Sequence, residues 1–157
     1  MNNLIVSIHL LFNVNNVDLT KIEKYITRVN PRHNKTTVTN LAININKSAI
    51  KWEIDPMIMT RLIAAESHFK FGAKSNTGDF SLVQINCKIW TKEFRNLRRR
   101  KLDCIRLVKD PAYALDRMAE ILSIVKKRSI NKYWYLGYHS NTKKLRLKYL
   151  KNIRKND

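Results

Sequence analysis

Apolar residues recur three and four positions apart along much of the chain, and this spacing constrains the fold more than any other feature of the sequence. It places the apolar side chains of each segment on one face of an α-helix. The segments with this spacing lie at 19–29, 38–52, 59–66 and 114–125. The chain also has only three Gly and three Pro, which disfavours a turn-rich all-β fold. The sequence therefore predicts a mainly α fold.

Two of these helices have clear starting signals. Asp55-Pro56 and Asp110-Pro111 each place a capping carboxylate before a proline at the first helical position. A last helix is predicted to start near Asn131. Residues 72–79 (GAKSNTGD) predict a loop, and the weak alternation that follows predicts a small β element or an extended loop near 79–86.

The length of 157 residues and the 44% apolar content fit one domain, 1–157, with its own hydrophobic core. No linker or repeat divides the chain. The apolar run at 4–12 is too short to span a bilayer and lacks the basic region and cleavage site of a signal peptide. We expect it to be part of the fold.

Cys87 and Cys104 are the only two cysteines, and they do not form a metal-binding motif. We expect two free thiols, with a disulfide in an oxidising compartment as the alternative. The four histidines, at 9, 33, 68 and 139, also lack metal-ligand spacing. The sequence therefore implies no metal and no organic cofactor.

Glu66 stands out because it ends an apolar stripe. It follows Met59, Leu62 and Ile63 at the spacing of one helix face, so its carboxyl is expected to point toward the core side. Burying a charged carboxylate is costly, which favours the protonated form. A protonated carboxyl in a partly apolar cleft can protonate a glycosidic oxygen. The alternative is that Glu66 lies at a solvated rim.

The residues after Glu66 form a series of short motifs in a fixed order. They are Glu66-Ser67, Ala73-Lys74-Ser75, Gly78, Gln84-Ile85-Asn86, Asp110-Pro111 with Ala114, Tyr138-His139-Ser140, and Tyr149. Together they resemble the Glu-Ser, A-x-S, Gly, G-L-M-Q-I, D-P-x-x-N and A-Y-N-x-G motifs and the later tyrosine of the lysozyme-like lytic transglycosylases, the SLT-domain family. The resemblance covers roughly residues 20–153. Ser81 stands where this family usually has glycine, and His139 stands where it usually has asparagine.

The resemblance implies a lysozyme-like fold and an enzyme that cleaves peptidoglycan. Glu66 would protonate the oxygen that links N-acetylmuramic acid to N-acetylglucosamine. It would then act as a base on the 6-hydroxyl of the muramic acid, which closes an anhydro ring. The residues that would bind the substrate are Ser67, Ser75, Gln84, Asn86, Tyr138, His139 and Tyr149.

Asp79 distinguishes two possible reactions. The segment 79–86 (DFSLVQIN) also resembles the D-Y-G-I-L-Q-I-N of animal-type lysozymes, in which the aspartate is a second catalytic carboxylate, and Glu66-Ser67-His68 resembles goose-type lysozymes. A hydrolytic muramidase that uses Glu66 and Asp79 is therefore the alternative. Otherwise Asp79 is a turn residue after Gly78.

The net charge of +19 indicates a polyanionic partner. Peptidoglycan with its attached anionic polymers is the expected partner of a monomeric enzyme that acts in the periplasm or wall. Without a signal peptide, the enzyme would be delivered by another route, which suits a phage endolysin or virion protein. A basic nucleic-acid-binding module that uses 95–101 (RNLRRRK) is the alternative from another class. It leaves the position of Glu66 unexplained, so nucleic acid is not expected as the main partner.

Overall fold

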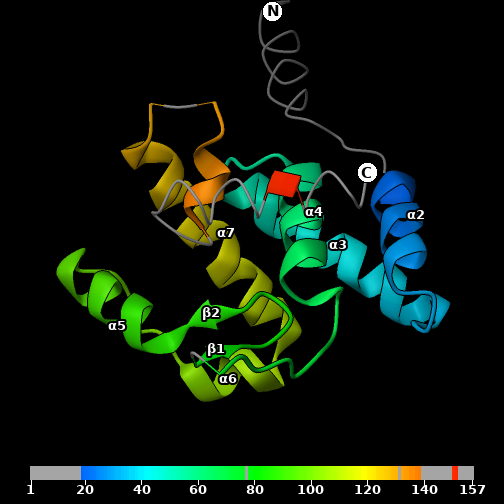
Figure 1. Ribbon diagram of the computed structural model, residues 1–157, viewed down its shortest axis with the longest axis horizontal. Helices are drawn as coiled ribbons and strands as arrows, with labels where there is room; N and C mark the ends of the chain where they lie inside the picture. Colours follow the sequence, from blue (N-terminus) through cyan, green and yellow to red (C-terminus); the bar gives the residue numbers. More distant parts are fainter. Residues whose placement is uncertain (1–18, 77, 131, 139–149, 152–157) are drawn as a thin grey trace, which may run out of the picture.

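The computed structural model describes residues 19–76, 78–130, 132–138 and 150–151, and within them the chain is mainly helical (Figure 1). The elements in chain order are α2 (Leu19–Val29), α3 (Lys35–Lys51), α4 (Pro56–Ser67), β1 (Asp79–Phe80), β2 (Ile85–Asn86), α5 (Cys87–Asn96), α6 (Cys104–Lys109), α7 (Pro111–Arg128) and the 3-10 helix η1 (Trp134–Gly137). The predicted mainly α class with a small β element is confirmed.

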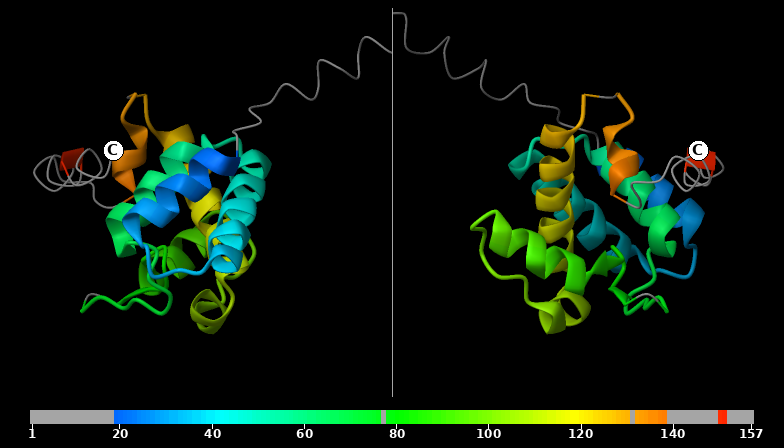
Figure 2. Two further views of the ribbon diagram at one scale, coloured as in Figure 1. Left: turned by 90° about the vertical axis from the view of Figure 1, so that its right-hand side faces the viewer. Right: turned by 60° about the vertical axis from the view of Figure 1, so that its left-hand side comes forward.

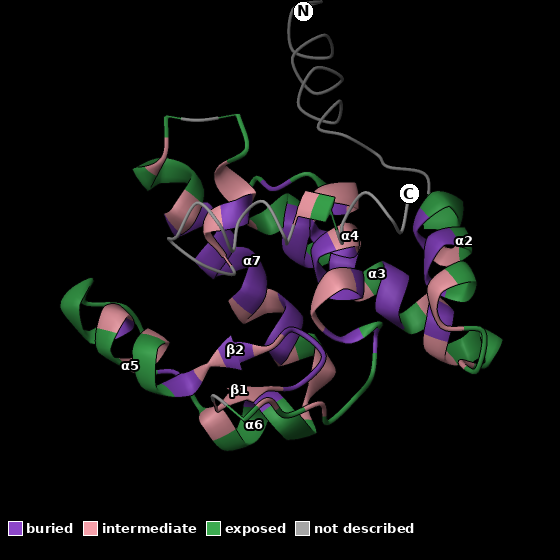
Figure 3. Cartoon of the chain, in the orientation of Figure 1, coloured by how far each residue is buried: buried purple, intermediate pink, exposed green. Residues whose placement is uncertain are grey.

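Helix α7 runs through the middle of the molecule and carries much of the core. Its apolar stripe is fully buried at Ala114, Leu115, Met118, Ile121 and Leu122, as the spacing predicts. It packs against α3, α6 and η1. Helices α2, α3 and α4 stack on one flank, whereas the hairpin, α5 and α6 gather at one end (Figure 2). In Figure 3 the buried residues gather on α4 and along α7, in the interior of the molecule.

The predicted helix starts are correct in detail. The Asp55 carboxylate accepts hydrogen bonds from the amides of Met57 at 2.7 Å and Ile58 at 3.0 Å, and Pro56 opens α4. The Asp110 carboxylate accepts from the amide of Tyr113 at 3.0 Å at the start of α7. These bonds satisfy amides that have no partner within the helix.

The segment after Asn131 differs from the prediction of a helix that starts there. The described residues 132–138 contain the four-residue 3-10 helix η1 in place of an α-helix, whereas Leu150 and Lys151 are helical. Consecutive aromatic residues at 133–135 lose side-chain freedom in an α-helix, and Gly137 disfavours its continuation. The apolar run at 4–12, and the rest of the predicted last helix apart from 150–151, lie outside the described residues. Of the helices that the structure describes, none is long and apolar enough to cross a membrane.

Cys87 and Cys104 form a disulfide, so the expectation of two free thiols is wrong. Each cysteine is the first residue of its helix, α5 or α6, and the fold brings the two Cα atoms to 5.9 Å from each other. Separation along the sequence carries no information about this distance, which is why the pairing was not predicted. The disulfide ties α5, which directly follows the hairpin, to α6.

We expect loss of this disulfide to lower the free energy of unfolding by about 3 kcal/mol. The bond joins cysteines that are 17 positions apart, so it closes a loop in the unfolded chain and lowers the entropy of that state. Guanidinium unfolding with and without dithiothreitol measures the effect. The double variant Cys87→Ala/Cys104→Ala should match the reduced protein and should not respond to reductant. Equal stability of the oxidised and reduced proteins would contradict the prediction.

Candidate active site

Glu66 is the last residue but one of α4 and is half-buried. The residues that share its helix face, Met59, Leu62 and Ile63, have no exposed surface. The face predicted to point inward therefore does so. The Glu66 carboxyl lies where this buried face meets the end of the helix.

The end of α4 is held in place from two sides. The buried hydroxyl of Ser67 donates to the carbonyl of Leu82 at 2.6 Å, which fixes the helix end to the hairpin turn. On the other side, the Asn30 amide donates to the carbonyl of His68 at 3.0 Å, and the His33 Nε2 lies 2.9 Å from the carbonyl oxygen of Phe69. The backbone next to Glu66 is thus held in place by the side chains of Ser67, Asn30 and His33.

Asn30 and His33 are two positioning residues that the sequence pattern did not reveal. In the sequence, the segment 30–34 (NPRHN) marks only the break between two helices. The structure shows why the anchoring is needed, because His68 and Phe69 both have a positive φ, of 52° and 59°. Such backbone is unfavourable for residues other than glycine and persists when the surroundings hold it.

The β1–β2 hairpin forms the second part of the site. Asp79 pairs with Asn86, and Phe80 pairs with Ile85. The turn between the strands is held by the Gln84 amide, which donates to the carbonyls of Ala73 at 3.0 Å and Ser81 at 2.8 Å. Gln84 therefore ties the turn to the loop that precedes the hairpin.

Both carboxylate oxygens of Asp79 accept hydrogen bonds from neighbouring side chains. The Ser75 hydroxyl donates to Oδ2 at 2.6 Å, and the Asn86 amide donates to Oδ1 at 2.9 Å. The Asn86 side-chain oxygen in turn accepts from the amide of Ile89 at 3.1 Å and caps α5. Asp79 thus links the loop, the hairpin and α5.

Tyr138 lies close to both candidate catalytic carboxylates. Its hydroxyl donates to the carbonyl of Val83 at 2.7 Å. Burial, and then the negative charges of Glu66 and Asp79, raise the pKa of the Tyr138 phenol well above its ordinary value. The phenol therefore stays protonated, and the effect of both charges on it indicates that Glu66 and Asp79 lie near Tyr138.

Seven of the residues that the sequence singled out lie around the end of α4, the hairpin and η1. They are Glu66, Ser67, Ser75, Asp79, Gln84, Asn86 and Tyr138. His139 and Tyr149 lie outside the described residues. In the part of the chain that the structure describes, no group of three His, Cys, Asp or Glu side chains is placed to hold a metal ion.

Ser81 is one departure from the motifs of the family that the sequence resembles, and its backbone shows why glycine is usual at this position. It has a φ of 68° at the position where the family usually has glycine. We expect Ser81→Gly to raise the free energy of unfolding by up to about 1 kcal/mol, because glycine adopts this backbone without strain. The control is Ser48→Gly in the last turn of α3, where the backbone is helical and the exchange should lower the free energy of unfolding by about 0.5 kcal/mol. Thermal unfolding of both variants checks the prediction, and a loss of stability in Ser81→Gly would contradict it.

The comparison with known proteins agrees with this geometry. The family model of the transglycosylase SLT domain matches residues 43–152, a range that includes α4, the hairpin and α7. No curated protein and no solved structure gave a match. The matched range covers well over half of the chain. The chain belongs to the transglycosylase SLT domain family, whose members are glycosidases and lytic transglycosylases that act on cell-wall peptidoglycan.

Proposed function

We propose that this enzyme cleaves the β-1,4 bond between N-acetylmuramic acid and N-acetylglucosamine by lytic transglycosylation, with Glu66 as its general acid and base. The observation that supports this reaction best is the hydrogen bonding of Asp79. Ser75 and Asn86 each donate to one of its carboxylate oxygens, which suits a structural residue better than a base or nucleophile. A reaction that needs one protein carboxylate is therefore the better fit.

In this mechanism, protonated Glu66 donates its proton to the glycosidic oxygen, and the N-acetylglucosamine leaves with the bonding electrons. The acetamido group of the muramic acid stabilises the positive charge that develops on the anomeric carbon. Glu66, now a carboxylate, accepts the proton of the 6-hydroxyl as that oxygen attacks the anomeric carbon. The anhydro ring closes without water, and Glu66 returns to its protonated form.

Tyr138 would orient Glu66 in this mechanism. Its hydroxyl hydrogen is donated to the Val83 carbonyl, so the phenol presents the lone pairs of its oxygen to the site. An acceptor of this kind would receive a hydrogen bond from Glu66 in its acid form and hold the carboxyl in one orientation. Ser67, Ser75, Gln84 and Asn86 would act as positioning residues through the hydrogen bonds described above. His139 and Tyr149 remain predicted contacts to the substrate.

A hydrolytic muramidase that uses Glu66 and Asp79 is the second candidate. The charge of Asp79 acts on the Tyr138 phenol together with that of Glu66, so both carboxylates lie near the same site. Inverting hydrolysis requires two carboxyl groups about 6.5–9.5 Å apart with a water between them, and a covalent retaining route about 5–5.5 Å.

Mass spectrometry of the soluble fragments released from purified peptidoglycan tests the proposed function. Disaccharide peptides that end in anhydromuramic acid are the expected products. Fragments with reducing muramic acid ends would favour the muramidase. The absence of any cleaved glycan would contradict both candidates.

A further inference from the structure

An open cavity of about 1010 Å³ lies on the molecule away from the candidate active site. Its walls come from the second half of α3, the linker 100–103, α6 and the first turns of α7. None of the residues assigned to the active site lines it. We call this cavity the basic groove, because its lining residues include more basic than acidic side chains.

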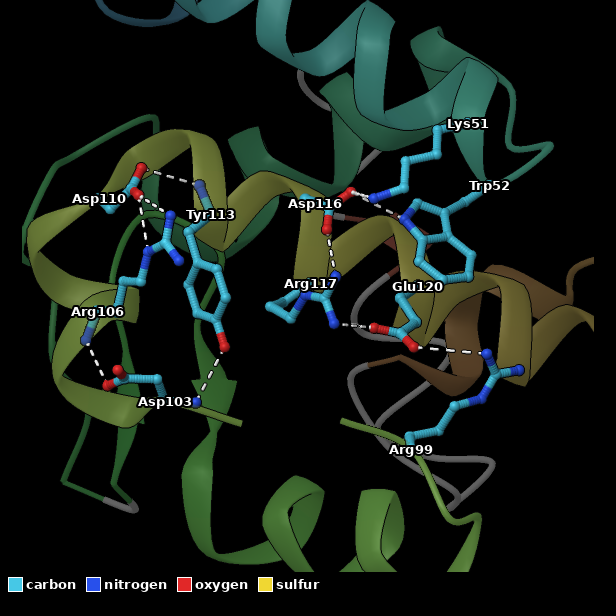
Figure 4. A network of polar contacts seen from close by, with 10 residues as sticks. All are labelled: Lys51, Trp52, Arg99, Asp103, Arg106, Asp110, Tyr113, Asp116, Arg117 and Glu120. Carbon is cyan, nitrogen blue, oxygen red and sulfur yellow. Dashed lines mark hydrogen bonds and ion pairs between the residues drawn. The ribbon is translucent and has the colours of Figure 1, made fainter. Parts of the chain in front are cut away.

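Three carboxylates line the basic groove, and each already has a partner (Figure 4). Asp110 forms an ion pair with Arg106 at 2.9 Å. Asp103 accepts from the amide of Arg106 at 2.9 Å and caps α6. Asp116 forms ion pairs with two cations. Each carboxylate of the groove is therefore already bound within the protein, by a cation or by a backbone amide.

Asp116 forms ion pairs with Lys51 at 2.7 Å and with Arg117, and the indole of Trp52 donates to it at 3.0 Å (Figure 4). Burial opposes the ionisation of Asp116, but the hydrogen bonds from these three side chains outweigh it and hold its pKa below the ordinary value. Lys51 and Arg117 are thus already paired with an ionised carboxylate.

Three other cations of the groove remain available. Lys47 from α3 and Arg100 and Lys101 from the linker line the groove and are exposed. Among the residues that the structure describes, no carboxylate lies within ion-pair distance of these three side chains. The groove therefore carries unbalanced positive charge on two separate segments of its wall, which attracts anionic groups.

The one aromatic side chain among the residues lining the groove is Tyr113, and two guanidinium groups lie close to its ring. The Cζ atoms of Arg106 and Arg117 lie 4.6 Å and 5.5 Å from the ring centroid (Figure 4). Both guanidinium groups would therefore compete with a nucleobase for this ring. Proteins that bind single-stranded nucleic acid combine a basic channel with such stacking surfaces. A polymer without bases fits this groove better.

We propose that the basic groove binds the phosphate groups of a flexible sugar- or polyol-phosphate polymer attached to the wall glycan. Lys47, Arg100 and Lys101 would contact successive phosphates, and the inference rests on the proposed peptidoglycan substrate. Cys104 lines the groove and is joined to Cys87, which directly follows Asn86 of the hairpin. A polymer held in the groove would thus be held on the unit that carries the active site.

The test compares two triple variants that lower the net charge equally. Lys47→Gln/Arg100→Gln/Lys101→Gln removes the available cations of the groove, and Lys24→Gln/Lys35→Gln/Lys127→Gln removes three exposed lysines that do not line it. The probe is a fluorescent oligo(glycerol phosphate), and its affinity is measured by polarisation at physiological salt. We expect the groove variant to bind at least about tenfold more weakly and the control to change less than about threefold. Equal weakening in both variants would overturn the proposal.

Two further measurements identify the occupant. A single-stranded oligodeoxynucleotide of equal charge should bind more weakly than the phosphate polymer and should lose similar affinity in both variants. Tighter binding of the oligonucleotide that is lost only in the groove variant would overturn the proposed ligand. On peptidoglycan stripped of polymer, all three proteins should cleave at equal rates, and on polymer-bearing walls the groove variant alone should be slower. Absence of cleavage by the unaltered protein would count against the proposed function. The affinities for oligo(glycerol phosphate) test the groove independently of cleavage.

Discussion

Replacing Glu66 by Gln is expected to lower the rate of glycan cleavage by at least about 10²–10⁴-fold without changing the fold. Gln has nearly the same size and shape as Glu, but its amide has no acidic proton to donate to the glycosidic oxygen. Because Glu66 is half-buried at a helix end that is anchored by Ser67, Asn30 and His33, the exchange should leave the backbone in place. The release of soluble fragments from purified peptidoglycan measures the rate.

The matched control is Glu53→Gln. Glu53 is an exposed glutamate that precedes α4, so the same chemical change occurs outside the site. Its rate should equal that of the unaltered protein, and thermal unfolding of both variants should show an unchanged midpoint. A folded Glu66→Gln protein with near-normal turnover would remove Glu66 from the mechanism.

The extent to which the sequence predicted the fold depends on how local the determining interactions are. The starts of α4 and α7 were predicted because Asp55-Pro56 and Asp110-Pro111 act within one helical turn. Helices α5 and α6 begin in the same way, with the side chains of Asn86 and Asp103 as caps. They were missed because they are short and many of their residues are exposed, so their apolar spacing is weak. The disulfide depends on a distance in space that no local pattern encodes.

The same distinction applies to the candidate site. Glu66 was identified from one helix face and its neighbouring motifs, which are local features. The anchoring of that helix end by Asn30 and His33 joins residues that are more than thirty positions apart. The hydrogen bonds of Asp79 likewise depend on the loop that brings Ser75 back to it and on the hairpin that brings Asn86 opposite. The sequence could therefore suggest two roles for Asp79 without choosing between them.

The hydrogen bonds of Asp79 lead to a prediction that separates its two roles. We expect Asp79→Asn to keep most of the activity, because an asparagine can still accept from Asn86 through its oxygen and can donate to the Ser75 oxygen through its amide. Asp79→Ala removes both links and should lower the rate by about tenfold or more, through a loosened hairpin. If Asp79 is a positioning residue, the two variants should therefore differ greatly in their rate of glycan cleavage.

A catalytic Asp79 predicts a different pattern. Both variants would then lose activity by orders of magnitude, because neither asparagine nor alanine supplies a base or a nucleophile. The products give a second and independent readout, since hydrolysis leaves reducing muramic acid ends that are one water heavier than the anhydro ends. We expect anhydro ends from the unaltered protein and from Asp79→Asn alike. Reducing ends together with an inactive Asp79→Asn variant would establish hydrolysis by two carboxylates. The role of Glu66 as the acid would remain, because both reactions begin with protonation of the same glycosidic oxygen.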